Sequence, residues 1–179
     1  IDIGTKYWEQ RYYKKCLNLY TQEDIDKCCL SYITGLKWTF DYYFVGCNNW
    51  SWKYDYRHAP SLKDLSVICN NLDINEIKLK KNKPYNVNVQ LLSIFPKNSQ
   101  YLIHNKYQFL MDHDSYLADY YPEDFDLDCY YKRYFWMCEP ILPNIDFERI
   151  NKYVKEVKLT KLESEEQKIK EVYYKGVLN

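Results

Sequence analysis

The sequence predicts a mainly α-helical fold with one small β-hairpin. Apolar residues recur every three or four positions through several stretches, which is the period of an amphipathic helix. Only four glycines occur among 179 residues, which argues against an all-β sandwich or a Gly-rich nucleotide-binding fold. With 46% apolar residues the chain is expected to fold. Its length fits a single domain that spans residues 1–179.

Two helices are predicted in the first quarter of the chain. Residues 4–20 place several aromatic and apolar side chains roughly on one side of a helix. Thr21 can cap the next helix, because its hydroxyl can accept a backbone N–H and Asp24 follows three positions later, as in a capping box. The helical period then runs to Tyr43, and Gly46 suits a left-handed C-cap. This long helix is expected to be the spine of the domain.

An unusual aromatic run follows the long helix, at residues 48–60. Pro60 disfavours a helix at Ala59, so the run is expected to be extended or loop-like. An extended backbone with a period of two puts the rings on one face and the polar side chains on the other. The rings in question are Trp50, Trp52, Tyr54, Tyr56 and His58.

The rest of the chain alternates short helices with Pro-bounded loops. Ser61, with Asp64 three positions later, can cap a helix as Thr21 does. Alternating Phe125, Leu127 and Cys129 indicate a hairpin. Further helices or helical turns are predicted at residues 85–95, 105–111 and 144–157, and residues 161–174 are strongly charged, as in a solvated helix.

Charge and cysteine content argue against a strongly basic nucleic-acid-binding protein, a zinc protein and a disulfide-bonded protein. Lys and Arg equal Asp and Glu at 25 each, so any binding of a polyanion needs a local patch or a partner surface. The seven cysteines form no C-x-x-C motif, so buried free thiols in a reducing compartment are favoured over a zinc site or disulfides. No signal peptide or membrane span is recognisable. Because the chain begins at Ile1, we expect it to be part of a longer protein.

Two clusters of charged residues are candidate sites. The acidic group comprises Asp119, Glu123, Asp124, Asp126 and Asp128. Clustered carboxylates can bind Mg²⁺, but alternation with apolar residues is also typical of a solvated hairpin edge, which we prefer. The basic loop comprises Lys78, Lys80, Lys81 and Lys83; it could touch phosphates, and a flexible solvated loop is preferred.

Other catalytic features are weak. His113 lies between two aspartates and is interpreted as a surface histidine. No Ser, Cys or Gly-rich motif indicates a nucleophile or a phosphate loop. The aromatic run therefore remains the main candidate, and its residues alone leave core packing and base stacking equally open.

The aromatic run and its surroundings resemble the second conserved region of the Xrn 5′→3′ exoribonucleases. The signature is the stretch from Gly35 to Leu65, where a G-L-x-W helix leads into a W-x-W-x-Y-x-Y-x-H-x-A-P segment. Matching stretches cover nearly the whole chain: YWEQRYYKKC, NVQLLSIFPKNS, YYPEDFDLD and FWMCEPILPNID. Two departures are notable: Lys53–Asp55 replaces an aromatic pair and a proline, and Cys138 and Glu139 replace small or apolar residues.

The resemblance implies a division of labour with a region outside this chain. In the family, the Mg²⁺ ligands and the pocket for the 5′-monophosphate lie in the first conserved region, so no catalytic or metal-binding residue is expected here. The second region packs against the first, walls the active-site pocket and stacks an aromatic ring on the leading RNA bases. That ring is predicted to be Trp52, or else Trp50. The residues expected to support the pocket are Tyr54, Tyr56, His58, Lys53 and Arg57.

The resemblance therefore predicts a helical lobe of a larger two-region nuclease that is inactive alone. The parent would degrade single-stranded RNA with a 5′-monophosphate to nucleoside monophosphates, using Mg²⁺ held elsewhere, in RNA degradation such as mRNA decay. The expected partners are this RNA and the N-terminal nuclease region of the same protein, without a membrane. An intracellular location is expected, cytoplasmic in preference to nuclear. The alternative is a detached, non-catalytic lobe that binds RNA or serves as a protein scaffold.

Overall fold

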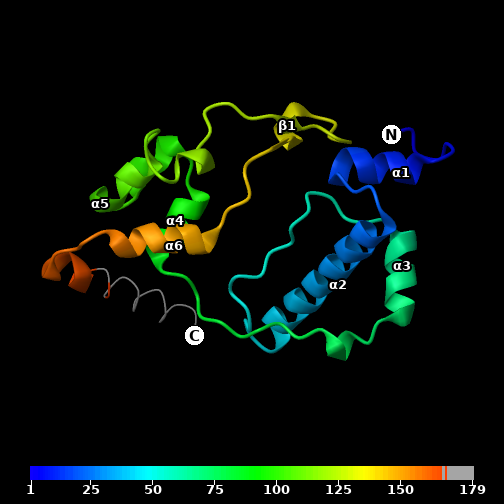
Figure 1. Ribbon diagram of the computed structural model, residues 1–179, viewed down its shortest axis with the longest axis horizontal. Helices are drawn as coiled ribbons and strands as arrows, with labels where there is room; N and C mark the ends of the chain where they lie inside the picture. Colours follow the sequence, from blue (N-terminus) through cyan, green and yellow to red (C-terminus); the bar gives the residue numbers. More distant parts are fainter. Residues whose placement is uncertain (167, 169–179) are drawn as a thin grey trace. The chain divides into compact units, whose positions relative to one another are not determined.

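The computed structural model describes residues 1–166 and 168. The chain divides into two compact units, of which the first spans Ile1–Pro84 and the second begins at Tyr85. Helices dominate both units, and the described residues contain one two-stranded sheet (Figure 1). The predicted mainly α-helical fold with a small hairpin is confirmed.

The first unit is built around one long helix. Helix α1 (Trp8–Tyr12) continues directly into a π-helical turn (Tyr13–Leu17), and α2 runs from Gln22 to Phe44. The Thr21 side chain accepts the backbone N–H of Asp24 at 3.2 Å, which confirms the predicted cap. Beyond the last turn Gly46 has φ +119°, a conformation that favours glycine.

Helix α3 (Leu62–Asn71) lies alongside α2 in this unit (Figure 1). Ser61 caps it as predicted, because its hydroxyl accepts the backbone N–H of Asp64 at 3.2 Å. Between α2 and α3, residues 52–61 form neither helix nor strand. A 3₁₀ turn (Ile74–Glu76) leads to an irregular segment that ends the unit.

The buried core of the first unit is small. Tyr13, Leu17 and Cys28 form its central cluster, with Tyr54 and Tyr56 of the aromatic run packed against it. Burial raises the pKa of the Cys28 thiol. The expectation that the cysteines are buried free thiols is wrong for two of them, because Cys69 and Cys129 are exposed.

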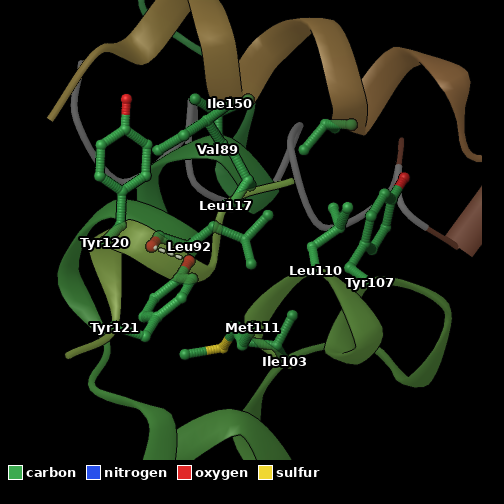
Figure 2. Packing of buried hydrophobic residues seen from close by; sticks show 11 residues of the cluster. Val89, Leu92, Ile103, Tyr107, Leu110, Met111, Leu117, Tyr120, Tyr121 and Ile150 are labelled. Carbon is green, nitrogen blue, oxygen red and sulfur yellow. Dashed lines mark hydrogen bonds between the residues drawn. The ribbon is translucent and has the colours of Figure 1, made fainter. Parts of the chain in front are cut away.

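The second unit packs short helices around a larger core. Its main helices are α4 (Val87–Ile94), α5 (Asn105–Gln108) and α6 (Phe147–Glu156), joined by 3₁₀ turns at Lys97–Leu102, Phe109–Met111, Ala118–Tyr120 and Phe135–Met137. Figure 2 shows this core, in which Leu92, Leu117 and Ile150 interdigitate. The buried Tyr121 hydroxyl donates to the Leu92 carbonyl oxygen at 2.7 Å, so its polar group is satisfied.

The hairpin in the second unit is shorter than the sequence suggests. Strands β1 (Leu127–Asp128) and β2 (Glu139–Pro140) pair antiparallel, with Leu127 opposite Pro140. The alternation at Phe125, Leu127 and Cys129 indicated a hairpin, but the strand after β1 does not follow at once: a turn at residues 130–131 and the 3₁₀ helix Phe135–Met137 come before β2. Pro140 cannot donate to the ladder, which limits the length of pairing.

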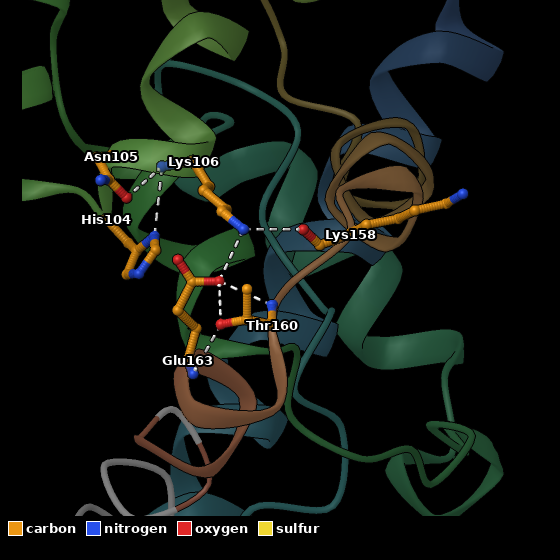
Figure 3. Close-up of polar contacts among 6 residues, drawn as sticks. All are labelled: His104, Asn105, Lys106, Lys158, Thr160 and Glu163. Atoms are coloured by element: carbon orange, nitrogen blue, oxygen red, sulfur yellow. Dashed lines mark hydrogen bonds and ion pairs between the residues drawn. The ribbon is translucent and has the colours of Figure 1, made fainter.

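A short helix at residues 161–166 is tied to α5 by a polar network (Figure 3). The Thr160 and Glu163 side chains accept each other's backbone N–H, as in a capping box. Lys106 pairs with Glu163 at 2.7 Å, which is the main reason that the pKa of Glu163 falls to about 2. The rest of the charged helix predicted to residue 174 lies largely outside the described residues. Among residues 1–166 and 168, no helix is both long and apolar enough to cross a membrane.

Candidate nucleic-acid interface

The aromatic run alternates in exposure along its length. From Trp52 to Ala59, even-numbered residues are half-buried and odd-numbered residues are exposed. This period of two is that of an extended backbone, and it confirms that the rings and the polar side chains face opposite ways. Trp50 departs from the pattern, because it is 44% exposed.

Trp52 packs on α2 at Gly35. Its ring stacks on Trp38 with centroids 5.5 Å apart, and Trp38 stacks in turn on Tyr42 at 5.5 Å. A Cβ atom at position 35 would lie 2.5 Å from Cη2 of Trp52, so this approach requires glycine. The helix therefore fixes the orientation of a half-buried indole.

Trp50 is held by its backbone and leaves its ring accessible. Its N–H donates to Oδ1 of Asn82 at 2.6 Å. Within the described part of the chain, its ring stacks on no other aromatic ring. An exposed ring on a fixed backbone is the arrangement that base stacking needs.

The remaining rings anchor the run to the core of the first unit. Tyr54 donates to the His58 carbonyl oxygen at 2.8 Å and lies 3.4 Å from Sγ of Cys28. Burial is the main cause of the strongly raised pKa of Tyr54. Tyr56 packs beside Tyr54, and His58 meets the ring of Tyr12 edge-on at 6.3 Å. These contacts hold the aromatic run against the core of the first unit, so the three rings serve as its structural support.

Two basic residues of the run lie on its exposed face. Lys53 and Arg57 are both exposed. Nζ of Lys53 lies 3.8 Å from a carboxylate oxygen of Asp55, which is a weak contact at the surface.

The basic loop lies next to the start of the aromatic run, which sequence reasoning did not foresee. Asn49 donates through Nδ2 to the Lys80 carbonyl oxygen at 2.9 Å. Asn82 donates through Nδ2 to Oγ of Ser51 at 2.5 Å, besides accepting from Trp50. We call Asn49, Ser51 and Asn82 the asparagine clamp. Asn82 lies more than 30 positions from Asn49 and Ser51, so no local pattern could have revealed the clamp.

Part of α2 presents an uncovered apolar face. Its first half buries Cys29 and Ile33, whereas its last turns expose large apolar side chains. The same helical period continues through both halves. The exposed set, which we call the α2 apolar face, is Leu36, Phe40, Tyr43 and Phe44.

The residues of the acidic group have different surroundings and different partners. Arg149 donates to both carboxylate oxygens of Asp119, at 2.7 and 2.9 Å. Asp124 and Asp126 are exposed, as a solvated hairpin edge predicts. His113 is a surface residue whose Nε2 lies 3.2 Å from Glu123. Across residues 1–166 and 168, no three His, Cys, Asp or Glu side chains are grouped so that they could hold a metal ion.

Comparison with known proteins assigns the chain to a family. Residues 1–177 match the family described as the Xrn1 helical domain. The chain belongs to the Xrn1 helical domain family. The predicted resemblance is thereby confirmed, and the G-L-x-W helix and aromatic run described above are part of this helical domain.

Several exoribonucleases carry a similar segment. The chain is 34% identical over 160 residues to 5′-3′ exoribonuclease 2 of Gallus gallus, covering 88% of this chain and 16% of the relative. It is 35% identical over 173 residues to 5′-3′ exoribonuclease 2 of Cryptococcus neoformans, covering 93% and 14%. The Schizosaccharomyces pombe relative of the same name is 33% identical over 165 residues, covering 88% and 16%. This Xrn1 helical domain therefore spans about one sixth of the length of these relatives.

Proposed function

We propose that this chain is the helical lobe of a 5′→3′ exoribonuclease and that one ring of its tryptophan pair, Trp52 or else Trp50, stacks on the leading bases of the RNA. The observation that carries the proposal is the pair itself, Trp50 with an open ring and Trp52 in a fixed orientation, on a segment anchored to the core. The names of the relatives support the activity of the parent protein.

The proposed role of the lobe is to position the substrate. Stacking fixes the first nucleotides, so that the scissile phosphate of a 5′-monophosphorylated strand meets the catalytic groups in the correct geometry. As the family resemblance implies, the proposal assigns Mg²⁺ and the hydrolytic step to the nuclease region outside this chain. Tyr54, Tyr56 and His58 hold the run in place, while Lys53 and Arg57 lie on its charged side.

Trp52 remains the first choice for the stacking ring. Trp38 and Gly35 set the orientation of its indole before RNA binds, which reduces the entropy lost on stacking. Trp50 is more open to solvent and is the second choice.

The α2 apolar face supports the other proposed partner, the N-terminal nuclease region of the same protein. Contiguous apolar patches on a surface mark sites of interaction. Leu36, Phe40 and Phe44 lie on consecutive turns of one helix, as expected of a face that another lobe covers.

The proposal is tested by single-turnover degradation of 5′-monophosphorylated RNA with the full-length protein. Stacking contributes about 1–3 kcal/mol per base, so Trp52→Ala is expected to lower kcat/KM by about 5- to 150-fold. Trp50→Ala tests the second ring, and Trp52→Phe keeps a ring and should retain most of the activity.

An abasic probe separates stacking from misfolding. If stacking is lost, the Trp52→Ala penalty should disappear on RNA whose leading nucleotides lack bases. A penalty of equal size on this probe would indicate a folding defect. Unchanged kinetics in both alanine variants would refute the stacking role, and the alternative of a non-catalytic scaffold would then be favoured.

A further inference from the structure

We propose that the basic loop, Lys78–Lys83, binds the phosphates of the same single-stranded RNA whose bases stack on the tryptophan pair. This inference rests on the proposed function and extends it. The tryptophan pair contacts the bases of the RNA, and the basic loop adds contacts to its phosphates. We call this row of lysines, Lys78, Lys80, Lys81 and Lys83, the phosphate path. The path belongs to this chain and is separate from the 5′-phosphate pocket expected in the nuclease region.

The first observation is the concentration of uncompensated charge. Lys78, Lys80, Lys81 and Lys83 are all exposed, and residues 77–86 contain no acidic residue. None of the four lysines forms an ion pair with any carboxylate of residues 1–166 and 168. In a chain of zero net charge, this loop is a local positive patch of the kind that a polyanion needs.

The second observation is the position of this charge. The asparagine clamp joins the loop to the tryptophan segment at several points. Asn82 stands between Lys81 and Lys83 in the sequence and accepts the N–H of Trp50 at 2.6 Å. The Asn82 N–H donates to the Asn48 carbonyl oxygen at 3.2 Å. The lysines therefore flank the residue that contacts the open tryptophan.

Another hydrogen bond fixes this arrangement to α2. The indole Nε1 of Trp38 donates to the Asn49 carbonyl oxygen at 2.7 Å. Trp38 is also the ring on which Trp52 stacks. One residue of α2 thus orients both the stacking ring and the clamp, so the aromatic and the basic parts are positioned together.

Aromatic rings beside a row of cations match the chemistry of single-stranded nucleic acid. Proteins that bind single strands without sequence preference stack bases on aromatic rings and follow the backbone with positive charge. Lysine contacts phosphate as a flexible point charge and reads no sequence. A processive 5′→3′ exoribonuclease has to hold every sequence equally, which this combination achieves.

The lysine side chains can be tested without breaking the clamp. The clamp uses the carbonyl group of Lys80 and the side chains of Asn49, Ser51 and Asn82, and no lysine ammonium group. Replacing Lys80, Lys81 and Lys83 by Gln removes three charges and leaves these hydrogen bonds intact. A matched control removes three exposed charges from the same unit, at Lys6, Lys14 and Lys15.

The experiment measures how salt affects binding of a fluorescent single-stranded uridine RNA to the full-length protein, in EDTA to prevent hydrolysis. Each phosphate contact adds about 0.7 to the slope of log affinity against log salt for single strands. The triple variant K80Q/K81Q/K83Q is expected to lower this slope by about 2 and to weaken binding most at low salt. The control K6Q/K14Q/K15Q should keep the slope of the unmodified protein.

The outcome for the loop can be told apart from the outcome for the tryptophans. An unchanged slope in K80Q/K81Q/K83Q overturns the inference, and the proposed function stands if Trp52→Ala still slows degradation. Equal losses of slope in the triple variant and its control also overturn the inference, because they show only a general charge effect. The slope could also fall in the triple variant alone while Trp52→Ala and Trp50→Ala leave RNA degradation unchanged. That result would support the phosphate path and refute the stacking role.

Discussion

The two units of this chain bury apolar clusters of different size. The second unit buries a cluster of eleven residues among those described, from Val89 to Val154. The first unit buries a cluster of only three, Tyr13, Leu17 and Cys28. Both units also leave large apolar side chains exposed, among them Trp50 and the α2 apolar face in the first unit and Phe135 and Trp136 in the second.

This difference in the size of the buried cluster bears on the stability of each unit. Buried apolar area is the main source of folding free energy. The second unit, which has the larger buried cluster, is therefore expected to be the more stable of the two. Exposed rings contribute little to stability and mark surfaces that contact something else. In the first unit, Trp50 and the α2 apolar face are the surfaces through which RNA and the nuclease region are proposed to act.

The largest expected effect is in the core of the second unit. Leu92 is fully buried on α4, so Leu92→Ala is expected to cost about 2–5 kcal/mol of unfolding free energy. Ile94→Ala on the same helix is the control, because Ile94 is 72% exposed and its loss should cost far less. Chemical denaturation measures both. Equal destabilisation by the two variants would contradict the assignment of this core.

The next effect is expected where α2 meets Trp52. Gly35→Ala places a Cβ atom 2.5 Å from the indole, so Trp52 has to move. Overpacking of this kind costs about 1–3 kcal/mol, offset by up to about 1 kcal/mol of helix propensity. We expect altered tryptophan fluorescence and slower single-turnover RNA degradation.

Thr39→Ala is the control for Gly35→Ala, because it changes an exposed position of the same helix. Fluorescence and kinetics should stay as in the unmodified protein. If Gly35→Ala left both readouts unchanged, the close approach of Trp52 to α2 would not matter for the site.

A smaller effect is expected from Glu163 in the second unit, and it depends on pH. Lys106 is the main cause of its lowered pKa, about 2 in the folded state, against about 4.3 in an unfolded chain. A carboxyl group with a lowered pKa stabilises the fold above its unfolded pKa, and this stabilisation is lost as the pH falls towards 2. Glu163→Gln should thus lower the melting temperature at neutral pH, with the difference shrinking in acid.

Glu166→Gln provides the comparison for this ion pair, because Glu166 is an exposed residue of the same short helix. Its effect on the melting temperature should be smaller at neutral pH. A Glu163→Gln difference that stayed constant from neutral pH to pH 2 would show that the Lys106 ion pair is not its cause.

Local signals were enough to predict most helices of this chain. The Thr21 and Ser61 caps were predicted because each lies three positions from the N–H that it accepts. Alternation of exposure in the aromatic run followed from the period of two. The predicted stacking role of Trp52 came from the family resemblance and stays a prediction.

Long-range hydrogen bonds and exposure could not be predicted in the same way. The contact of Asn82 with Trp50 joins positions 32 residues apart, and no spacing rule links them. The apolar period of α2 runs through Cys29 and Phe40 alike, yet only Cys29 is buried. Periodicity shows that a face is apolar, whereas its burial depends on which element covers it.

The smallest effect is expected at Phe40, and it sharpens the contrast between the units. Phe40 is 60% exposed on the α2 apolar face, and the centroid of its ring lies 4.6 Å from that of Phe44. In the 179-residue chain, Phe40→Ser should therefore change the unfolding free energy by no more than about 0.5 kcal/mol. Phe147→Ser is the matched change in the second unit. Phe147 packs against the core and stacks on Tyr85 at 5.0 Å, so its loss should destabilise the chain clearly.

The same Phe40 substitution has a different expected outcome in the full-length protein. If the nuclease region covers the α2 apolar face, Phe40→Ser removes a buried contact there. Hydrogen exchange in the last turns of α2 should then rise relative to the unmodified full-length protein. Identical exchange in the two proteins would mean that this face stays open to solvent, and its proposed partner would have to bind elsewhere.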